Sequence, residues 1–322
     1  MGSKISPKPI IVDTDMAADD WMALLYLLQS PHADIRAITL AATGEAHTWF
    51  GVRNALRLLK LSKQTGIPVT AGRSSPLQGN NRFPLTWRIA MDLRFLLPLP
   101  WASQKRDPRS AIELLAELLE KSAEPLTIVA LGPLTNLGEL TQTHPELLVK
   151  IDRVVVMGGA LDVLGNLADG LPNTKNVYAE WNIYVDPHAA NLLFRSGVPV
   201  TLVPLDVTNR TPVTASYLQR FAEAAVTPAA QFVNRVLKRL EPIVGTEQFF
   251  FWDPLTAVLA THPELGSYRS CPVRVIETAT AGDQCGRTVV ADDGPVIEIC
   301  HTVDQATFEQ LFIDTINLPY PF

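Results

Sequence analysis

The stretch "PIIVDTDMAADD", residues 9–20, gathers four aspartates directly behind a short apolar run. The run is rich in β-branched residues, which favours a buried strand. The apolar residues between 21 and 28 recur at helical spacing, which predicts a helix immediately afterwards. The acids Asp13, Asp15, Asp19 and Asp20 therefore stand where a strand ends and a helix begins.

Strand and helix patterns alternate along the rest of the chain. Strands are predicted over 35–44, 68–72, 125–132, 151–159 and 198–206, and helices over 51–63, 110–122, 133–148 and 186–197. Nearly continuous apolar strands between helices are typical of a parallel sheet that is covered on both faces. The sequence thus predicts an α/β fold with an open, mostly parallel central sheet flanked by helices. We expect one domain over residues 1–322, with residues 1–8 as a loose tail.

The composition argues against several classes of partner. The 322 residues carry a net charge of −6 with scattered Lys and Arg, whereas nucleic-acid binding needs a basic stripe. No apolar run approaches the length of a membrane span, and the first residues lack the apolar core of a signal peptide. The three cysteines form no CxxC pair and are expected to be reduced thiols. We therefore expect a cytoplasmic protein that binds neither nucleic acid nor membrane.

The crowded acids need an explanation of their own. Carboxylates this close repel one another, and some take up protons unless a positive charge neutralises them. A hard divalent cation accepts about six to eight oxygen ligands and would remove the conflict. Capping of the following helix by Asp19 or Asp20 is the simpler alternative, but it accounts for one or two acids rather than four. Ligands of parallel sheets bind beyond the carboxyl ends of the strands, which is where these acids are predicted to lie.

The pattern "DTDxxxDD" after an apolar strand resembles the signature of the nucleoside hydrolases, the inosine/uridine-preferring nucleoside N-ribohydrolases. Later segments agree in order: "VALGPLTNL" (129–137), "VVVMGGA" (154–160), "AEWNIYVDPHAA" (179–190), "FFFWDPLTAV" (249–258) and "GRTVV" (286–290). The resemblance runs from about residue 9 to 315. It implies Ca²⁺-dependent hydrolysis of the N-glycosidic bond of ribonucleosides, giving ribose and free base, by a homodimer or homotetramer.

The resemblance also implies a role for each matching residue. Asp15 would contact the metal and accept a proton from the attacking water. Asp20 and Asp253 would be carboxylate ligands, Leu131 would offer its backbone carbonyl, and Asp13 would support these ligands from behind. The chemistry is consistent, because a water on a cation is easier to deprotonate and carboxylates stabilise the oxocarbenium-like state of a departing sugar.

The same resemblance assigns the ribose hydroxyls to Asp19, Asn166, Glu180 and Asn182. Carboxylates and amides suit hydroxyls, which both donate and accept hydrogen bonds. The loop that carries Asn166 is longer than in compact family members, so Asn173 or Asn176 could take its place. Turn formation is the alternative explanation for these loop asparagines.

Three positions depart from the family pattern. Met16-Ala17 replaces the usual Pro-Gly, and Ala17 resists the positive φ that glycine accepts. Glu45 replaces an asparagine and could bind a sugar hydroxyl or a donor edge of the base. His47, close behind it, is either a general acid for the departing base or a surface residue. Trp252 stands where some members have a histidine; it can stack on a base but cannot donate a titratable proton.

Two other functions are compatible with the sequence. An aspartyl-nucleophile phosphatase could use "DTD", but it needs a downstream Lys and a further acid pair near the metal, and Asp292-Asp293 is the only other adjacent pair. The altered residues near 16 and 45 and the missing histidine suit a repurposed protein that binds nucleoside or ribose without turnover. The sequence does not identify the preferred base.

Overall fold

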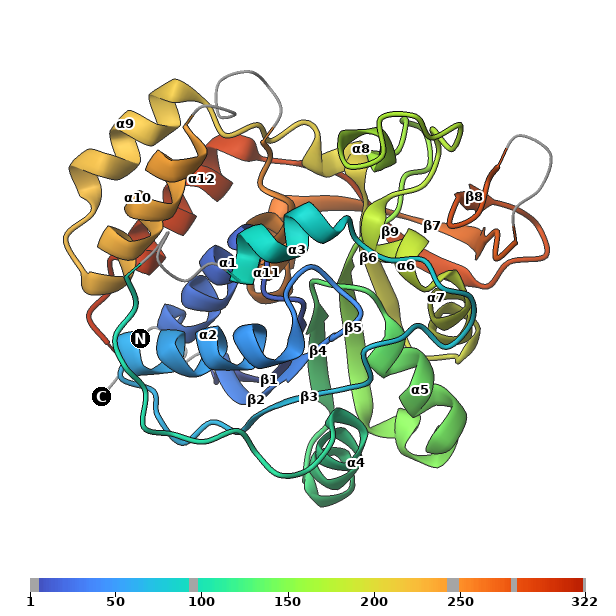
Figure 1. Ribbon diagram of the computed structural model, residues 1–322, viewed down its shortest axis with the longest axis horizontal. Coiled ribbons are helices and arrows are strands. Elements are labelled where there is room, and N and C mark those ends of the chain that lie inside the picture. Colours follow the sequence, from blue (N-terminus) through green and yellow to red (C-terminus); the bar gives the residue numbers. More distant parts are fainter. Residues whose placement is uncertain (1–5, 93–97, 242–248, 279–282, 321–322) are drawn as a thin grey trace.

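β1 (Lys8–Thr14) lies inside a nine-stranded sheet in the computed structural model, which describes residues 6–92, 98–241, 249–278 and 283–320 (Figure 1). The strand order is β3-β2-β1-β4-β5-β6-β9-β7-β8. Neighbours from β3 to β9 in this order are parallel, whereas β7 runs antiparallel to both β9 and β8. The predicted α/β class with an open, mostly parallel sheet is therefore confirmed.

The other strands are β2 (Ala33–Leu40), β3 (Val69–Ala71), β4 (Leu126–Ala130), β5 (Ile151–Met157), β6 (Val200–Val203), β7 (Gly266–Val275), β8 (Thr288–Val290) and β9 (Val296–Val303). The helices are α1 (Ala18–Gln29), α2 (Thr48–Leu61), α3 (Leu85–Asp92), α4 (Ala111–Lys121), α5 (Thr135–Thr143), α6 (Trp181–Val185), α7 (Pro187–Arg195), α8 (Leu205–Thr208), α9 (Ala215–Ala224), α10 (Pro228–Leu240), α11 (Trp252–Thr261) and α12 (Gln305–Ile316). Short 3-10 helices cover Pro145–Lys150, Leu167–Asp169 and Pro263–Leu265.

Two predictions about the N-terminal part need correction. β1 begins at Lys8, so the loose tail ends one residue earlier than expected, and its residues 1–5 lie outside the described part of the chain. Helix α3 is not among the helices that the sequence predicted, so the predicted set was incomplete. None of the described helices is both long enough and apolar enough to cross a bilayer.

The sheet separates two apolar cores because successive side chains of a strand point to opposite faces. Ile10 and Val12 of β1 pack into the core beside α1, α2, α10, α11 and α12, whereas Ile11 packs into the core beside α4, α5 and α7. Figure 1 shows these two groups of helices on either side of the strands. A strand buried on both faces has to be apolar throughout, which explains the run "IIV".

The register of the central strands aligns their carboxyl ends. Asp13 of β1 is paired with Ala130 of β4, and Ala130 is paired with Val156 of β5. The residues that follow these strands, among them Asp15 and Leu131, therefore lie along one edge of the sheet. This edge is where a parallel sheet offers a binding crevice.

A buried polar contact fixes the end of β1. The Asp13 carboxylate accepts hydrogen bonds from the Thr39 hydroxyl at 2.6 Å and from the Asn136 amide at 2.7 Å. Asn136 also donates to the carbonyl of Leu40 at 3.1 Å, so it joins β1, β2 and α5. Burial raises the pKa of Asp13 to about 7 despite both donors. Asp13 thus lies within the sheet, two residues before Asp15, consistent with the supporting role expected for it.

Replacing Asn136 by Ala should lower the free energy of unfolding by about 2–3 kcal/mol, because a buried carboxyl group and a buried carbonyl lose their donor. Urea denaturation measures the change. The matched control is Asn173→Ala on an exposed loop residue, which should stay within about 0.5 kcal/mol of the parent. An Asn136→Ala effect no larger than that of the control would contradict this account of the β1 terminus.

Candidate active site

The turn after β1 concentrates its strain at one residue. Met16 adopts the left-handed conformation with φ 62°, whereas Ala17 is extended with φ −67° and ψ 179°. The conflict expected at Ala17 therefore does not arise. A buried, non-glycine residue in the left-handed region costs on the order of 1 kcal/mol, and such strain gathers at functional sites.

Asp15 is tightly enclosed at the end of this turn. Its carboxylate accepts the N–H of Glu45 at 3.0 Å and, more weakly, the N–H of Ala17 at 3.4 Å. A Cβ atom placed on Gly44 would lie 2.1 Å from Asp15, and one on Gly132 would lie 2.7 Å away. Both glycines are therefore needed for the carboxylate to lie where it does.

Asp20 connects the turn to α1. Its carboxylate accepts the N–H of Ala17 at 3.0 Å, the N–H of Asp15 at 3.1 Å and the hydroxyl of Thr14. Helix capping, the simpler explanation for an acid here, is thus part of what Asp20 does. It does not explain why further acids face the same carboxylate.

Carboxylate oxygens of Asp19, Asp20 and Asp253 lie within 4.8 Å of one another, and no other group of three such ligands occurs in the described residues. Asp253 reaches the cluster from the first turn of α11. Burial and then mutual repulsion raise the pKa of Asp19 to about 7 and that of Asp20 to about 6, and they raise the pKa of Asp253 well above its usual value. Asp15 lies beside the cluster, since its backbone N–H donates to the Asp20 carboxylate at 3.1 Å. Burial and then the charge of Asp20 raise the pKa of Asp15 too. Buried oxygen donors in mutual repulsion fit a hard cation.

These acids lie in an inner chamber of about 120 Å³. Apart from the supporting Asp13 and the alternative asparagines Asn173 and Asn176, its lining includes every predicted site residue except His47, namely Asp15, Asp19, Asp20, Glu45, Leu131, Asn166, Glu180, Asn182, Trp252 and Asp253. Residues far apart in the sequence thus converge at one strand edge. The convergence depends on the parallel register, which brings the ends of β1, β4 and β5 together.

The hydrogen bonds of Glu180 and Asn182 explain their positions in the wall. Glu180 precedes α6 and accepts three backbone N–H groups, from Gly159 at 2.9 Å, Asn182 at 2.8 Å and Ile183 at 3.1 Å. The Asn182 amide donates to the carbonyl of Leu131 at 3.0 Å. The side chain of Asn182 is thereby anchored to the strand end that carries the predicted carbonyl ligand.

Of the three loop asparagines considered for ribose binding, Asn166 lines the chamber. Its side-chain oxygen accepts the N–H of Trp181 at 3.2 Å. Asn176 is buried, and its amide donates to the carbonyl of Cys285 at 2.7 Å, so its role is structural. Asn173 is exposed on the loop and lines neither this chamber nor the outer one described below.

Two roles were left open for His47, a general acid for the departing base and a surface residue, and its position in the structure lies away from both chambers. Its Nδ1 atom lies 2.5 Å from the Asp92 carboxylate, and its backbone N–H donates to the same carboxylate at 3.2 Å. His47 is not among the residues that line the inner or the outer chamber. Asp92 comes from α3, a helix that the sequence did not predict, so this pairing could not be foreseen.

An outer chamber of about 730 Å³ adjoins the inner one. Ala17, Asp19, Glu45, Trp87, Asn166, Asp169 and Trp252 line both chambers. The rest of its wall is mainly apolar, with Phe249, Phe250, Met91, Leu164, Leu205 and Leu240. Asp169 was missed, because a single acid in an irregular loop gives no signal.

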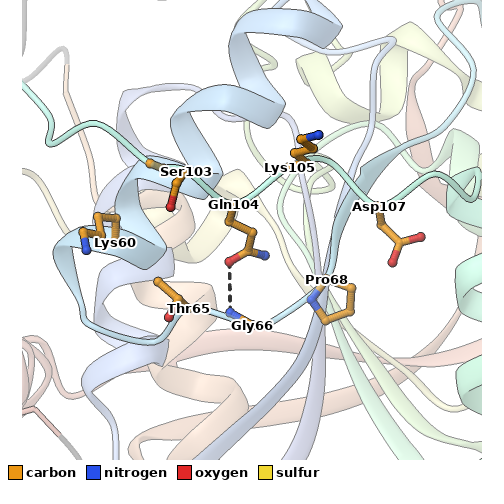
Figure 2. A pocket seen from close by; sticks show the side chains of 9 residues that line it. Lys60, Thr65, Gly66, Pro68, Ser103, Gln104, Lys105 and Asp107 are labelled. Carbon is orange, nitrogen blue, oxygen red and sulfur yellow. Dashed lines mark hydrogen bonds between the residues drawn. The ribbon is translucent and has the colours of Figure 1, made fainter.

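A third hollow, of about 500 Å³, lies elsewhere (Figure 2). Gly66 and Pro68, just before β3, face the chain around Gln104, whose side chain accepts the N–H of Gly66 at 2.9 Å. It therefore adjoins the amino end of a strand, opposite to the edge that carries the acids. Its lining holds no cluster of catalytic or ligand groups.

Comparison with known proteins agrees with this geometry. The sequence profile described as inosine-uridine preferring nucleoside hydrolase matches residues 10–310. The chain belongs to this family. It is accordingly an enzyme, a ribonucleoside hydrolase that cleaves N-glycosyl bonds.

Individual relatives span most of the chain. The pyrimidine-specific ribonucleoside hydrolase RihA of Salmonella enteritidis is 37% identical over 263 residues, 80% of each chain. The protein of the same name from Photobacterium profundum is 36% identical over 289 residues, 88% of each chain. Among solved structures, a plant nucleoside hydrolase has a TM-score of 0.84 at 28% identity and covers 98% of this chain and 100% of its own. An inosine-uridine preferring nucleoside hydrolase from Bacillus anthracis, at 23% identity and TM-score 0.85 over 97% of this chain and 100% of its own, shares the fold.

Without divalent cations the protein should lose stability as the pH rises from about 4 to 7. Asp13, Asp19 and Asp20 hold protons in the folded state up to a pKa of about 6 to 7, whereas the unfolded chain releases them near 3.8. Each group that holds a proton only when folded lowers the free energy of unfolding by up to about 1.4 kcal/mol per pH unit across this interval. Calorimetric Tm values at pH 5, 6, 7 and 8 in EDTA test this. A Tm that does not change with pH over this interval would contradict the electrostatic account.

Proposed function

We propose that this ribonucleoside hydrolase depends on Ca²⁺, held by Asp20 and Asp253 together with Asp15 and the Leu131 carbonyl. The observation that carries the proposal is the buried carboxylate cluster at the end of β1. Among the described residues, no Lys, Arg or His lines the inner chamber, although the charge of the partly buried Arg88 interacts with that of Asp15 from outside the lining. Asp19 belongs to the same cluster, so it either joins the ligands or binds a hydroxyl beside them.

The donor set fits calcium better than a softer metal. The cluster offers only oxygen atoms, and neither cysteine nor histidine lines the inner chamber in the described part of the chain. Bound there, calcium would hold the ribose diol and make a water molecule easier to deprotonate.

The protein side chains supply the remaining chemistry. Asp15 is enclosed so tightly that its carboxylate has one position, which suits a base that takes a proton from the attacking water. The inner chamber, at about 120 Å³, is far smaller than the roughly 300 Å³ of a drug-sized pocket and suits a pentose. Asn166, Glu180 and Asn182 would bind the hydroxyls.

The surrounding carboxylates also favour bond cleavage. Positive charge develops on the ribose ring as the base departs, and preoriented negative groups stabilise it without reorganising. The base would then lie at the mouth of the inner chamber, where Trp87 and Trp252 can contact its ring. Glu45, which lines both chambers, would contact a hydroxyl or a donor edge of the base.

The alternatives are less well supported. A phosphatase would need a Lys at the acids, and none lines either chamber among the described residues. The second acid pair lies on the turn between β8 and β9, where Asp293 pairs with Arg274 at 3.1 Å. A cytoplasmic location and a homodimer or homotetramer stay predictions from the sequence.

Replacing Asp15 by Asn should lower kcat by about 10²–10⁴-fold, because the isosteric amide cannot take up the proton. Release of reducing sugar from uridine, cytidine and inosine measures the change, and circular dichroism confirms the fold. Uridine and cytidine come first because two relatives are named pyrimidine-specific. The matched control is Asp292→Asn on an exposed turn, which should keep kcat within about twofold.

Two outcomes would count against the proposal. Near-normal turnover by the Asp15→Asn enzyme would remove Asp15 from its role as base. Tight binding of a nucleoside with no sugar released from any member of the panel, in the presence of calcium, would favour the repurposed binding protein instead.

A further inference from the structure

We infer that the site selects nucleosides whose base already carries a positive charge on the ring, such as N7-alkylated purine nucleosides and N-ribosylpyridinium compounds. The inference rests on the proposed function and adds a substrate class to it. It follows from the charge of the two chambers, the aromatic groups at their junction and the lack of a histidine in either lining, among the described residues, that could protonate the leaving base.

The first observation is the negative charge of the side chains that line the two chambers. The inner and outer chambers are lined by seven acids, Asp15, Asp19, Asp20, Glu45, Asp169, Glu180 and Asp253. No Lys, Arg or His lines either chamber among the described residues. Crowded carboxylates do not all ionise together, and a bound divalent cation would offset the charge of its own ligands. The charge that a substrate base meets therefore comes mainly from the acids that are neither proposed ligands nor part of the cluster, Glu45, Asp169 and Glu180. A field of one sign inside a low-dielectric cavity favours a ligand of the opposite sign.

Two of the acids lie where the base would be. Glu45 and Asp169 line both the inner and the outer chamber, so they border the passage between ribose and base. Asp169 ends a short 3-10 helix in the loop that also carries Asn166. It does not belong to the cluster of Asp19, Asp20 and Asp253, and it has no assigned part in catalysis or ribose binding.

The second observation is the group of aromatic side chains that line the two chambers. Trp87 and Trp252 line both chambers, and Phe249 and Phe250 line the outer one. Ring faces attract cations through their quadrupole, and Trp does so most strongly. Carboxylates combined with several aromatic faces form the usual cage for a cationic ring or a quaternary nitrogen. An apolar wall alone would suit any base, but the addition of unpaired acids makes a positive ring the better fit.

The third observation concerns the leaving group. A neutral base departs with the electron pair of the C1′–N bond and needs a proton, which histidine supplies in many enzymes. His47 is held by Asp92 outside both chambers, and the indole N–H of Trp252 can donate a hydrogen bond but does not titrate. A ring that is already cationic needs no acid. As the C1′–N bond breaks, its electron pair neutralises the ring. The water oxygen bonds to C1′, and the proton goes to Asp15 and then to solvent.

Guanosine and 7-methylguanosine form a matched pair, because they differ by one methyl group and one positive charge. The kcat/KM of each nucleoside is measured with calcium present and divided by the rate of its uncatalysed hydrolysis, so that differences in the lability of the C1′–N bond cancel. The corrected ratio is the quotient for 7-methylguanosine over that for guanosine. We expect the corrected ratio to favour 7-methylguanosine at least about tenfold. The Asp169→Asn variant should lower this ratio about three- to tenfold, whereas the exposed Asp292→Asn variant should leave it unchanged.

Inhibition by 1-methylnicotinamide and by nicotinamide, a cation and its neutral parent, gives a second readout without chemistry. We expect the cation to have a Ki at least about tenfold lower. Equal Ki values together with a corrected ratio near one would overturn the inference while hydrolysis of neutral nucleosides left the proposed function intact. A preference that survives Asp169→Asn would remove Asp169 from the account. Absence of hydrolysis of every nucleoside would instead refute the proposed function.

Discussion

The structure is organised around an unfavourable interaction, the mutual repulsion of buried carboxylates at the carboxyl end of β1. Asp19, Asp20 and Asp253 bring oxygen atoms within 4.8 Å of one another, and Asp15 lies beside them. Left without a cation, such groups retain protons to unusually high pH. A fold keeps this arrangement only if its other contacts stabilise it and if a ligand offsets the charge.

Those other contacts are visible around the turn. The parallel register sets Asp15 and Leu131 on one edge, while Asn136 and Thr39 fix Asp13 inside the sheet. Gly44 and Gly132 leave just enough room for the Asp15 side chain. The left-handed backbone of Met16 lets the chain reverse into α1, so that Asp20 can bind the turn and face Asp253 together. The position of the carboxylate cluster therefore depends on both the register of the sheet and the conformation of the turn after β1.

The sequence predicted much of this because its signals are local and periodic. Apolar runs and helical spacing predicted the α/β class. The sequence motifs also predicted which residues contact the metal or the substrate, and all of these except His47 line the inner chamber. The sequence did not predict the positions of residues that lie in segments without a regular apolar pattern. The sequence left His47 open between a general acid and a surface residue, because its partner Asp92 comes from α3, a helix that the sequence did not predict. Asp169 was missed because a lone loop acid has no pattern. The conflict foreseen at Ala17 fell on Met16, since which residue of a turn takes positive φ depends on the whole backbone path.

The central claim is that the acids after β1 hold one hard cation. Anomalous diffraction at long wavelength from crystals grown with calcium tests it most directly, because it locates the ion independently of any assumed ligand. The account predicts one strong peak about 2.3–2.6 Å from carboxylate oxygens of both Asp20 and Asp253. An empty cluster at saturating calcium, or a peak only at surface acids such as Asp292 and Asp293, would contradict it.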